Sequence, residues 1–233
     1  MKVEHIKRSK NSVSFVLEDR EQLHILKPDS LIAFRASGDY NAKHKHLPIF
    51  KNILNRRSFV ESVISGSAEG ILALPEGCVL TIIKVNDENV FYEYKNILCY
   101  SSGIRIDSVK QKVKHMIFTG SIFQARLRGS GTVVLMSSGE LVDWALDANI
   151  PVFVRFGNLV SLPSDNITCN IGTFGNEMAV QNGGYHYILK GQGKILIESL
   201  SSREYIELMK ARKDSVFKRI VRRYLPGGDI IIP

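Results

Sequence analysis

The histidines are the side chains of this sequence best suited to catalysis or to binding a metal ion. His44 and His46 alternate around Lys45, so a strand would place both imidazoles on one face. A structural metal site needs about four ligands, and the charge of Lys45 would repel a cation. We therefore expect this segment to be a solvated loop, and we expect the protein to bind no metal ion or other cofactor.

Nucleophilic catalysis needs a Ser or Cys held near a His and a carboxylate. The sequence contains no G-x-S-x-G elbow, H-E-x-x-H motif, Walker loop or dinucleotide fingerprint, and His24 has no companion signature. His186 lies between two tyrosines, and strand alternation predicts that it points away from them, half-exposed. Trp144 is expected to be a packing residue. We predict no enzymatic activity and name no catalytic residue.

The cysteines indicate a reducing compartment. Cys78, Cys99 and Cys169 are an odd number at wide spacing, with no C-x-x-C pair, so they form no disulfide framework. We expect free thiols in the core or near the surface. The first residues are basic but lead into no apolar run, which argues against a secretory signal. The expected location is the cytoplasm.

The positive charge is concentrated in two segments. The chain of 233 residues carries 31 Lys and Arg against 23 Asp and Glu, a net charge of +8. Residues 41–59 hold five basic and no acidic residues, and residues 201–233 hold eight basic against four acidic residues. The rest of the chain is nearly neutral, so these segments are the predicted contacts with an anionic partner. The candidate anion-contacting residues are Lys43, Lys45, Arg56, Arg57, Lys218, Arg219, Arg222 and Arg223.

Residues 201–233 are predicted to form an amphipathic helix and tail. Tyr205, Met209, Val216 and Ile220 recur at helical spacing, with basic residues in the last turns. Such a helix fits three roles. It packs on the β core or on a neighbouring subunit, it touches an anionic membrane surface, or it binds nucleic acid. Residues 41–59 are expected to form a basic loop inserted into the core.

Two unrelated motifs recur at the same spacing of 62 residues. The first is apolar with a short polar centre, and the second carries Gly-x-Gly or a single glycine. The aligned segments are Val90–Tyr100 with Val152–Leu162, and Leu127–Leu135 with Leu189–Ile197, with weaker first copies at His24–Phe34 and Ala73–Thr81. We infer three modules of about sixty residues, roughly 24–85, 90–147 and 152–200.

Each module is β in character. Short runs of Val, Ile, Phe and Tyr are cut by turn clusters, and Ser12–Leu17 adds an N-terminal strand. The polar centres, such as Lys95 with Asn96, predict a hairpin or a tight strand corner. Gly129 and Gly131 precede a strand-like run rather than a helix, which indicates a strand corner and not a phosphate loop. Three small modules would bury their apolar faces against one another, with pseudo-threefold symmetry.

The stretch 118–135 resembles the glycine-bearing signature of the family called "altered inheritance of mitochondria, number twenty-four". The segments 31–34, 97–103 and 159–162 are similar to its recurring strand after a turn, and the resemblance spans about 24–200. It implies an all-β fold similar to the tryptophan RNA-binding attenuator type, a short double-stranded β-helix that assembles into rings or symmetric oligomers. It supplies no catalytic residues, and the segments 41–59 and 201–233 depart from it.

Together these patterns predict a non-enzymatic, self-associating β scaffold whose basic appendages meet an anionic partner or membrane surface. One alternative is a nucleic-acid-binding protein, suggested by the attenuator-like fold and the basic loop. A second alternative is a small-molecule-binding β-helix domain, which would have a concave cavity lined by His or carboxylates.

Overall fold

The computed structural model describes residues 1–36, 41–46, 60–87, 90–110, 123–155, 157–163, 166–173 and 185–200. These residues form eighteen β-strands and two short 3₁₀ turns, and none of them lies in a helix of seven or more residues. The elements are β1 (Lys2–His5), β2 (Ser12–Leu17), β3 (Gln22–Ile25), η1 (Pro28–Ser30), β4 (Leu31–Ala36), β5 (Asn41–His46), β6 (Val60–Ser65), β7 (Ala68–Ala73), β8 (Val79–Asn86), β9 (Val90–Glu93), η3 (Tyr94–Asn96), β10 (Ile97–Ser101), β11 (Ile104–Lys110), β12 (Phe123–Ser137), β13 (Leu141–Leu146), β14 (Val152–Arg155), β15 (Leu159–Pro163), β16 (Ile167–Thr173), β17 (Tyr185–Gly191) and β18 (Gly193–Glu198).

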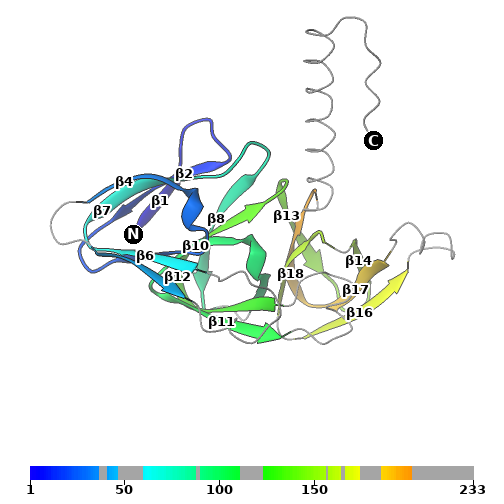
Figure 1. The fold of residues 1–233 in the computed structure, drawn as a ribbon. Helices are drawn as coiled ribbons and strands as arrows, with labels where there is room; N and C mark the ends of the chain where they lie inside the picture. The colour runs from blue at the N-terminus through cyan, green and yellow to red at the C-terminus, as the bar shows by residue number, and fades with distance from the viewer. Residues whose placement is uncertain are drawn as a thin grey trace, which may run out of the picture.

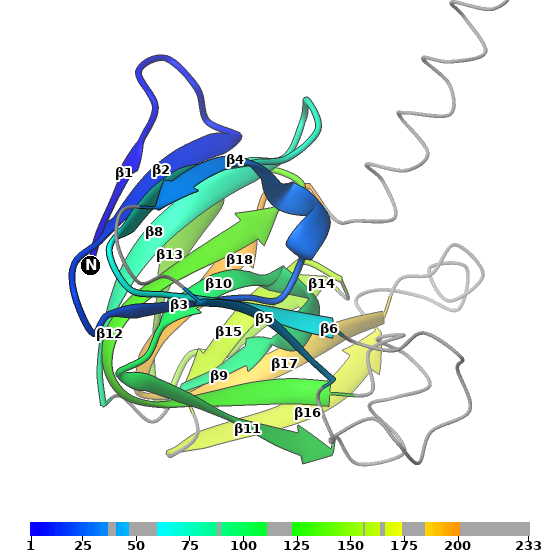
Figure 2. The ribbon, with the colours of Figure 1, turned by 60° about the vertical axis from the view of Figure 1, so that its left-hand side comes forward.

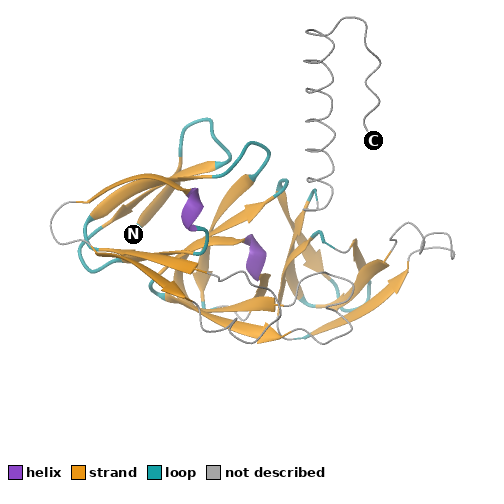
Figure 3. Ribbon diagram, viewed as in Figure 1, coloured by secondary structure: helices purple, strands orange, loops and turns teal. Residues whose placement is uncertain are grey.

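The strands form three antiparallel sheets, which confirms the all-β prediction. A four-stranded sheet has the order β1-β2-β7-β4, and a three-stranded sheet has the order β14-β17-β16. The largest sheet has eleven strands, in the order β13-β18-β15-β9-β12-β10-β3-β6-β5, with β8 and β11 also paired to β12. In Figure 1 the four-stranded and three-stranded sheets lie at opposite ends of the molecule, and the largest sheet lies between them. Figure 3 shows that most of the described chain is β-strand.

The polar centres of the first motif are strand corners and not hairpins. η1 separates β3 from β4, which lie in different sheets, and η3 separates β9 from β10, which do not pair with each other. In both places the first amide after the turn donates back to its first residue, Leu31 to the Pro28 carbonyl and Ile97 to the Tyr94 carbonyl. The turn therefore carries the chain from one sheet or ladder to the next.

The strand after each corner is bulged at the same point. The register shifts between Leu31 and Ala33 on β4, between Ile97 and Cys99 on β10, and between Leu159 and Ser161 on β15. An extra residue at a bulge bends the strand and increases its twist. These bends help to fold the sheets around three apolar clusters, which are centred on Phe15, Leu127 and Leu189.

The glycine before the second half of β12 confirms the corner prediction. Gly129 has φ +91°, in the left-handed region that favours glycine. Its amide donates to the Asp87 carboxylate at 2.8 Å, and the Asp87 amide donates to the Gly129 carbonyl, also at 2.8 Å. A strand continues beyond it, so the segment offers no helix N-terminus for phosphate.

Two expectations about local structure are wrong. Trp144 lies on β13 with 52% of its surface exposed, because β13 pairs with β18 alone within the described residues and has an open edge. Residues 41–46 form strand β5, paired with β6, because the apolar run of β6 provides a ladder for them. The remainder of the predicted loop at 41–59 and the helix predicted for 201–233 lie outside the described residues.

Candidate functional site

An open pocket of about 480 Å³ lies where β10 and β11 meet β3 and β6. Strand pairing positions two of its walls, since β10 places Tyr100 directly opposite His24 on β3. β3 pairs in turn with β6, which carries Glu61. The lining residues are His24, Glu61, Tyr100, Ser102, Gly103, Ile104, Arg105 and Ile106.

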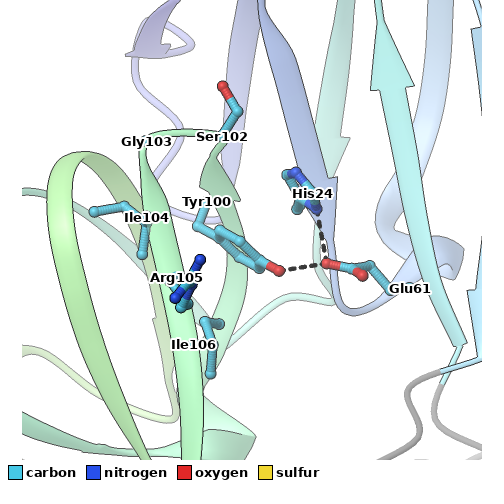
Figure 4. Close-up of a pocket in the computed structure, with 8 residues that line it drawn as sticks. All are labelled: His24, Glu61, Tyr100, Ser102, Gly103, Ile104, Arg105 and Ile106. Carbon is cyan, nitrogen blue, oxygen red and sulfur yellow. Dashed lines mark hydrogen bonds and ion pairs between the residues drawn. The ribbon is translucent and has the colours of Figure 1, made fainter.

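Three polar side chains in this pocket form one cluster. The buried Glu61, 3% exposed, accepts a hydrogen bond at Oε1 from the Tyr100 hydroxyl, and the same oxygen lies 2.9 Å from His24 Nδ1 (Figure 4). The rings of His24 and Tyr100 stack with centroids 4.7 Å apart and an interplanar angle of 14°. The carboxylate thus holds the imidazole and the phenol in fixed orientations.

Burial, together with the charge of Glu61, keeps the neighbouring phenols protonated. Burial raises the pKa of Tyr100, and the hydrogen bond to Glu61 and the charge of Glu61 raise it further. Burial also raises the pKa of Tyr94, with the charge of Glu61 as the second cause. Ionising either phenol would place a second negative charge near Glu61 in a poorly solvated site. Tyr100 is therefore a hydrogen-bond donor at all physiological pH values.

The opposite wall of the pocket is supplied by β11. In Figure 4 Tyr100 lies between Glu61 and the side chains of Ile104, Arg105 and Ile106. Arg105 is exposed, and within the described residues it makes no hydrogen bond or ion pair. The nearby Arg128 differs, because its Nε lies 3.1 Å from Asp107 Oδ2. The pocket therefore combines apolar side chains with one guanidinium group that no described residue pairs with.

Of the residues selected from the sequence, Lys43 does not line this pocket, and the backbone of Lys45 lies directly opposite Glu61 in the pairing of β5 with β6. Lys43 is exposed on β5, and the backbone of Lys45 lies on the same strand. The other candidate anion-contacting residues, Arg56, Arg57, Lys218, Arg219, Arg222 and Arg223, lie outside the described residues. In the part of the chain that the structure describes, no group of three or more His, Cys, Asp or Glu could hold a metal ion. No helix in that part is long and apolar enough to cross a bilayer.

Sequence reasoning missed the cluster because its members are far apart in the chain. His24 does have a companion, Glu61, which lies 37 residues away and is joined to it only through the pairing of β3 with β6. The one signal in the sequence was a carboxylate directly after Val60 at the start of the β-rich segment VESVIS of β6. His186 matches its expectation, since it is half-buried while Tyr187 beside it is buried.

The fold and the pocket place this chain among all-β proteins. Its described strands form three antiparallel sheets, with a polar cluster where β10 meets β3. The chain belongs to the AIM24 family, described as mitochondrial biogenesis AIM24, whose model matches residues 3–200. A protein of Streptococcus pyogenes with a known crystal structure has a similar fold. The TM-score is 0.67 at 15% sequence identity, covering 91% of this chain and 99% of that one. No curated protein matches the sequence.

Proposed function

We propose that this chain is a non-enzymatic binding protein, a triplicated β framework with one ligand pocket at the junction of its first two units. The ligand class is a small molecule that carries a carboxylate or phosphate group on an apolar body. The cluster of His24, Glu61 and Tyr100 is the polar wall of that pocket, and Arg105 is the residue that pairs with the anionic group.

The strand pairings support the triplication. Four kinds of pairing each occur three times, and the strands of each set follow one another in the same order along the chain. The sets are β2·β7, β8·β12 and β13·β18; β4·β7, β10·β12 and β15·β18; β5·β6, β11·β12 and β16·β17; β3·β6, β9·β12 and β14·β17. In this proposal β12 corresponds to β6 and β7 joined, and the units begin at β2, β8 and β13. An attenuator-like β-helix with pseudo-threefold symmetry is the arrangement we propose for them.

The observation that carries the proposed function is the difference between two junctions. β10 on β3 places Tyr100 opposite His24, whereas β15 on β9 places Leu162 opposite Phe91. Aligning the first motif matches Ile25 with Phe91, so Ser62 matches Arg126 and Glu61 matches Ala125, which is fully buried. One junction is thus polar where the other is apolar.

Burying a carboxylate is unfavourable unless its charge is compensated, and an apolar replacement is often as stable or more stable. At the positions that match His24, Tyr100 and Glu61, the junction of β15 with β9 carries Val90, Leu162 and Ala125, so the fold does not require a polar cluster there. Perturbed ionisable groups that line a cavity are typical of functional sites. We therefore assign the cluster to ligand binding.

The charges favour an anionic ligand. Glu61 already accepts a hydrogen bond from Tyr100 and lies 2.9 Å from His24 Nδ1, whereas the Arg105 side chain has no partner within the described residues. A guanidinium group binds carboxylate and phosphate through two parallel hydrogen bonds. Ile104 and Ile106 flank it, so an apolar body beside the anionic group fits this wall.

The orientation of Ser102 supports the non-enzymatic part of the proposal. Ser102, His24 and Glu61 line one pocket and include the residue types of a catalytic triad. Ser102 makes no side-chain hydrogen bond within the described residues, and Figure 4 shows its hydroxyl pointing away from the His24 ring. Without a base in contact, the hydroxyl is not activated as a nucleophile.

A titration followed by NMR amide shifts tests the ligand class. Butyrate, inorganic phosphate and butylammonium are added separately to the full chain. We expect butyrate to shift the amides of β10 and β11, with at least tenfold weaker binding in Arg105→Gln and unchanged binding in the control Arg128→Gln. Phosphate binding equal to butyrate binding would identify the oxyanion alone as the ligand. Butylammonium binding that Glu61→Gln abolishes would contradict the anionic class.

The basic appendages remain a separate proposal that rests on sequence. If residues 201–233 contact an anionic membrane surface, the full chain floats with anionic vesicles but not with neutral vesicles, and deletion of 201–233 abolishes flotation. Tight, salt-sensitive RNA binding by the same chain would favour the nucleic-acid alternative instead.

A further inference from the structure

Two apolar side chains on β13, Val142 and Trp144, form an exposed row that is called the β13 row below. Val142 is 46% exposed and Trp144 is 52% exposed. In the pairing with β18, which lies beside β13 in Figure 2, Val142 is opposite Ile197 and Trp144 is opposite Ile195. Directly opposite residues project to the same face of a sheet. Ile195 is fully buried in the cluster centred on Leu189 and Ile197 packs against it, so the β13 row continues that cluster to the edge of the sheet.

The strand β2 shows the effect of a cover that β13 lacks. β2 pairs with β7 on one side and with β1 on the other, and four of its six residues are buried. β13 pairs with β18 alone within the described residues, and four of its six residues are exposed. Soluble proteins cover apolar side chains beside an open strand edge with a helix, a loop or another strand. The β13 row therefore marks a place where a further segment packs.

The chain leaves the described part of the structure beside this row. The Ser199 amide donates to the Glu140 carbonyl at 2.9 Å, and a Cβ at Gly139 would lie 3.1 Å from the Leu200 Cβ. Leu200 therefore lies next to the residues that precede β13. Residues 201–233 continue from this point, beyond the residues 3–200 that the AIM24 family model matches. A segment that starts here reaches the β13 row without a long connection.

We propose that residues 201–233 fold back in the same copy and cover the β13 row with the apolar stripe of their predicted helix. The stripe consists of Tyr205, Met209, Val216 and Ile220. Removing apolar surface from water is the main favourable contribution to such packing. The candidate anion-contacting residues from Lys218 onward follow the part of the helix that reaches the row, so they stay accessible to an anionic partner. The inference does not depend on the pocket ligand, and either idea can fail without the other.

The spacing of the stripe matches the spacing of the row. Four residues of a helix advance by about 6 Å, and two residues of a strand advance by about 7 Å. Tyr205 and Met209 are therefore as far apart along a helix as Val142 and Trp144 are along β13. The chain arrives at the start of β13, so a helix that turns back over the sheet runs in the direction of β13. This places Tyr205 on Val142 and Met209 on Trp144, and a thioether beside an aromatic ring is a favourable contact.

The charges fit the same register. β13 together with the flanking Glu140 and Asp147 carries three acidic side chains and no basic one, whereas residues 201–233 carry eight basic against four acidic residues. Glu140 is paired with Lys10, while Asp147 at the far end of β13 accepts backbone amides and has no ion pair within the described residues. Lys213, one helical turn beyond the two docked residues, comes beside Asp147. Complementary charges at the end of a contact help to fix its register.

The competing arrangements involve a second copy of the chain or a membrane surface. A second copy on the β13 row would make the contact join two chains. A membrane would take up the apolar stripe of the segment and leave Trp144 exposed as long as no vesicles are present. The segment of the same chain is favoured, because it is tethered next to the row and its effective concentration there is high.

The fluorescence of Trp144 reports the contact directly, because the chain contains one tryptophan. Burial of the indole excludes a quencher, so we expect acrylamide to quench the full-length wild type about threefold less than Met209→Glu, which places a charge in the contact. Glu207→Gln is the matched control and should behave as the wild type, since residues two apart on a helix do not share a face. Equal quenching of the wild type and Met209→Glu overturns the inference. Protection of Trp144 only after anionic vesicles are added overturns it in favour of a membrane.

Cross-linking with a short bismaleimide tests the register and shows which chain supplies the segment. The background carries Cys78→Ser and Cys169→Ser, and the remaining Cys99 is buried. Val142→Cys with Tyr205→Cys should cross-link within one chain, which mass spectrometry of the digested monomer detects. Val142→Cys with Glu207→Cys is the control and should cross-link far less. A covalent dimer would assign the β13 row to a second copy. No cross-link in the first pair, or equal cross-linking in both pairs, overturns the docking.

Discussion

Replacing the polar cluster with the apolar residues of the other junction tests whether the cluster serves the fold or the ligand. The variant combines His24→Val, Tyr100→Leu and Glu61→Ala, which copies Val90, Leu162 and Ala125, the residues at the aligned positions of the other junction. Because a buried ion pair is often replaced by apolar residues without loss, we expect the free energy of unfolding to stay within about 1 kcal/mol of the wild type, or to rise.

Single changes in the same cluster should behave differently. His24→Ala leaves the Glu61 carboxylate buried and removes the imidazole that lies 2.9 Å from its Oε1. Removing one member of a buried pair costs roughly 3–5 kcal/mol, and the 21% exposure of the His24 side chain admits water that lowers this to about 2–4 kcal/mol. For a chain of this length each kcal/mol shifts Tm by roughly 2–4 °C. Tm should therefore fall by about 5–15 °C in the single variant and by only a few degrees in the triple variant.

Urea unfolding followed by circular dichroism measures the two free energies, and the butyrate titration measures binding. The reasoning requires the triple variant to be more stable than His24→Ala and to have lost at least tenfold in butyrate affinity. A triple variant that is less stable than His24→Ala would show that the cluster is part of the fold. A triple variant that binds butyrate as tightly as the wild type would show that the cluster is not part of the site.

Two further predictions concern ionisation and backbone geometry. Since the pKa of Tyr100 is raised above its ordinary value near 10, the folded state keeps a proton that the unfolded chain releases. This stabilisation is complete below pH 10 and is lost above it at about 1.4 kcal/mol per pH unit. In Tyr100→Phe the free energy of unfolding should therefore fall less steeply above pH 10 than in the wild type. An equally steep fall in the variant would contradict this explanation. A Cβ at Gly129 would lie 2.2 Å from the Gly103 carbonyl oxygen at a φ of +91°, so Gly129→Ala should lower the unfolding free energy by about 2–4 kcal/mol. Ser130→Ala is the matched control, and equal stability of the two variants would refute the steric argument.

The sequence predicted the features that depend on local residue chemistry. The β character, the strand Ser12–Leu17, the turn centres and the positive φ of Gly129 all follow from residue type and period. The sequence does not distinguish a hairpin from a strand corner at Lys95 and Asn96, because the same turn-forming residues occur in both. Only the sheet order shows that β9 and β10 leave the turn toward different partners.

The candidate site depended on long-range pairing, which sequence pattern does not supply. Glu61 is an ordinary residue by sequence pattern, and its burial depends on strands far away in the chain, since β5 pairs with β6 at Glu61 and His24 of β3 and Tyr100 of β10 contact its carboxylate. Trp144 shows the reverse case, since a large aromatic residue is normally buried, yet the open edge of β13 exposes it. The sequence contains the side chains, but which of them meet or stay exposed is decided by the neighbours of their strands.

In the triplicated framework that we propose, the junction positions account for where a function would arise. The same bulged strand meets a polar partner at His24, an apolar partner at Phe91, and no described partner at the edge of β4. The backbone geometry is common to all three, so the geometry alone selects no ligand and no partner. What differs is the side chains placed on it. We therefore expect a small ligand at the polar junction, whereas the apolar junction joins two strands of the same chain.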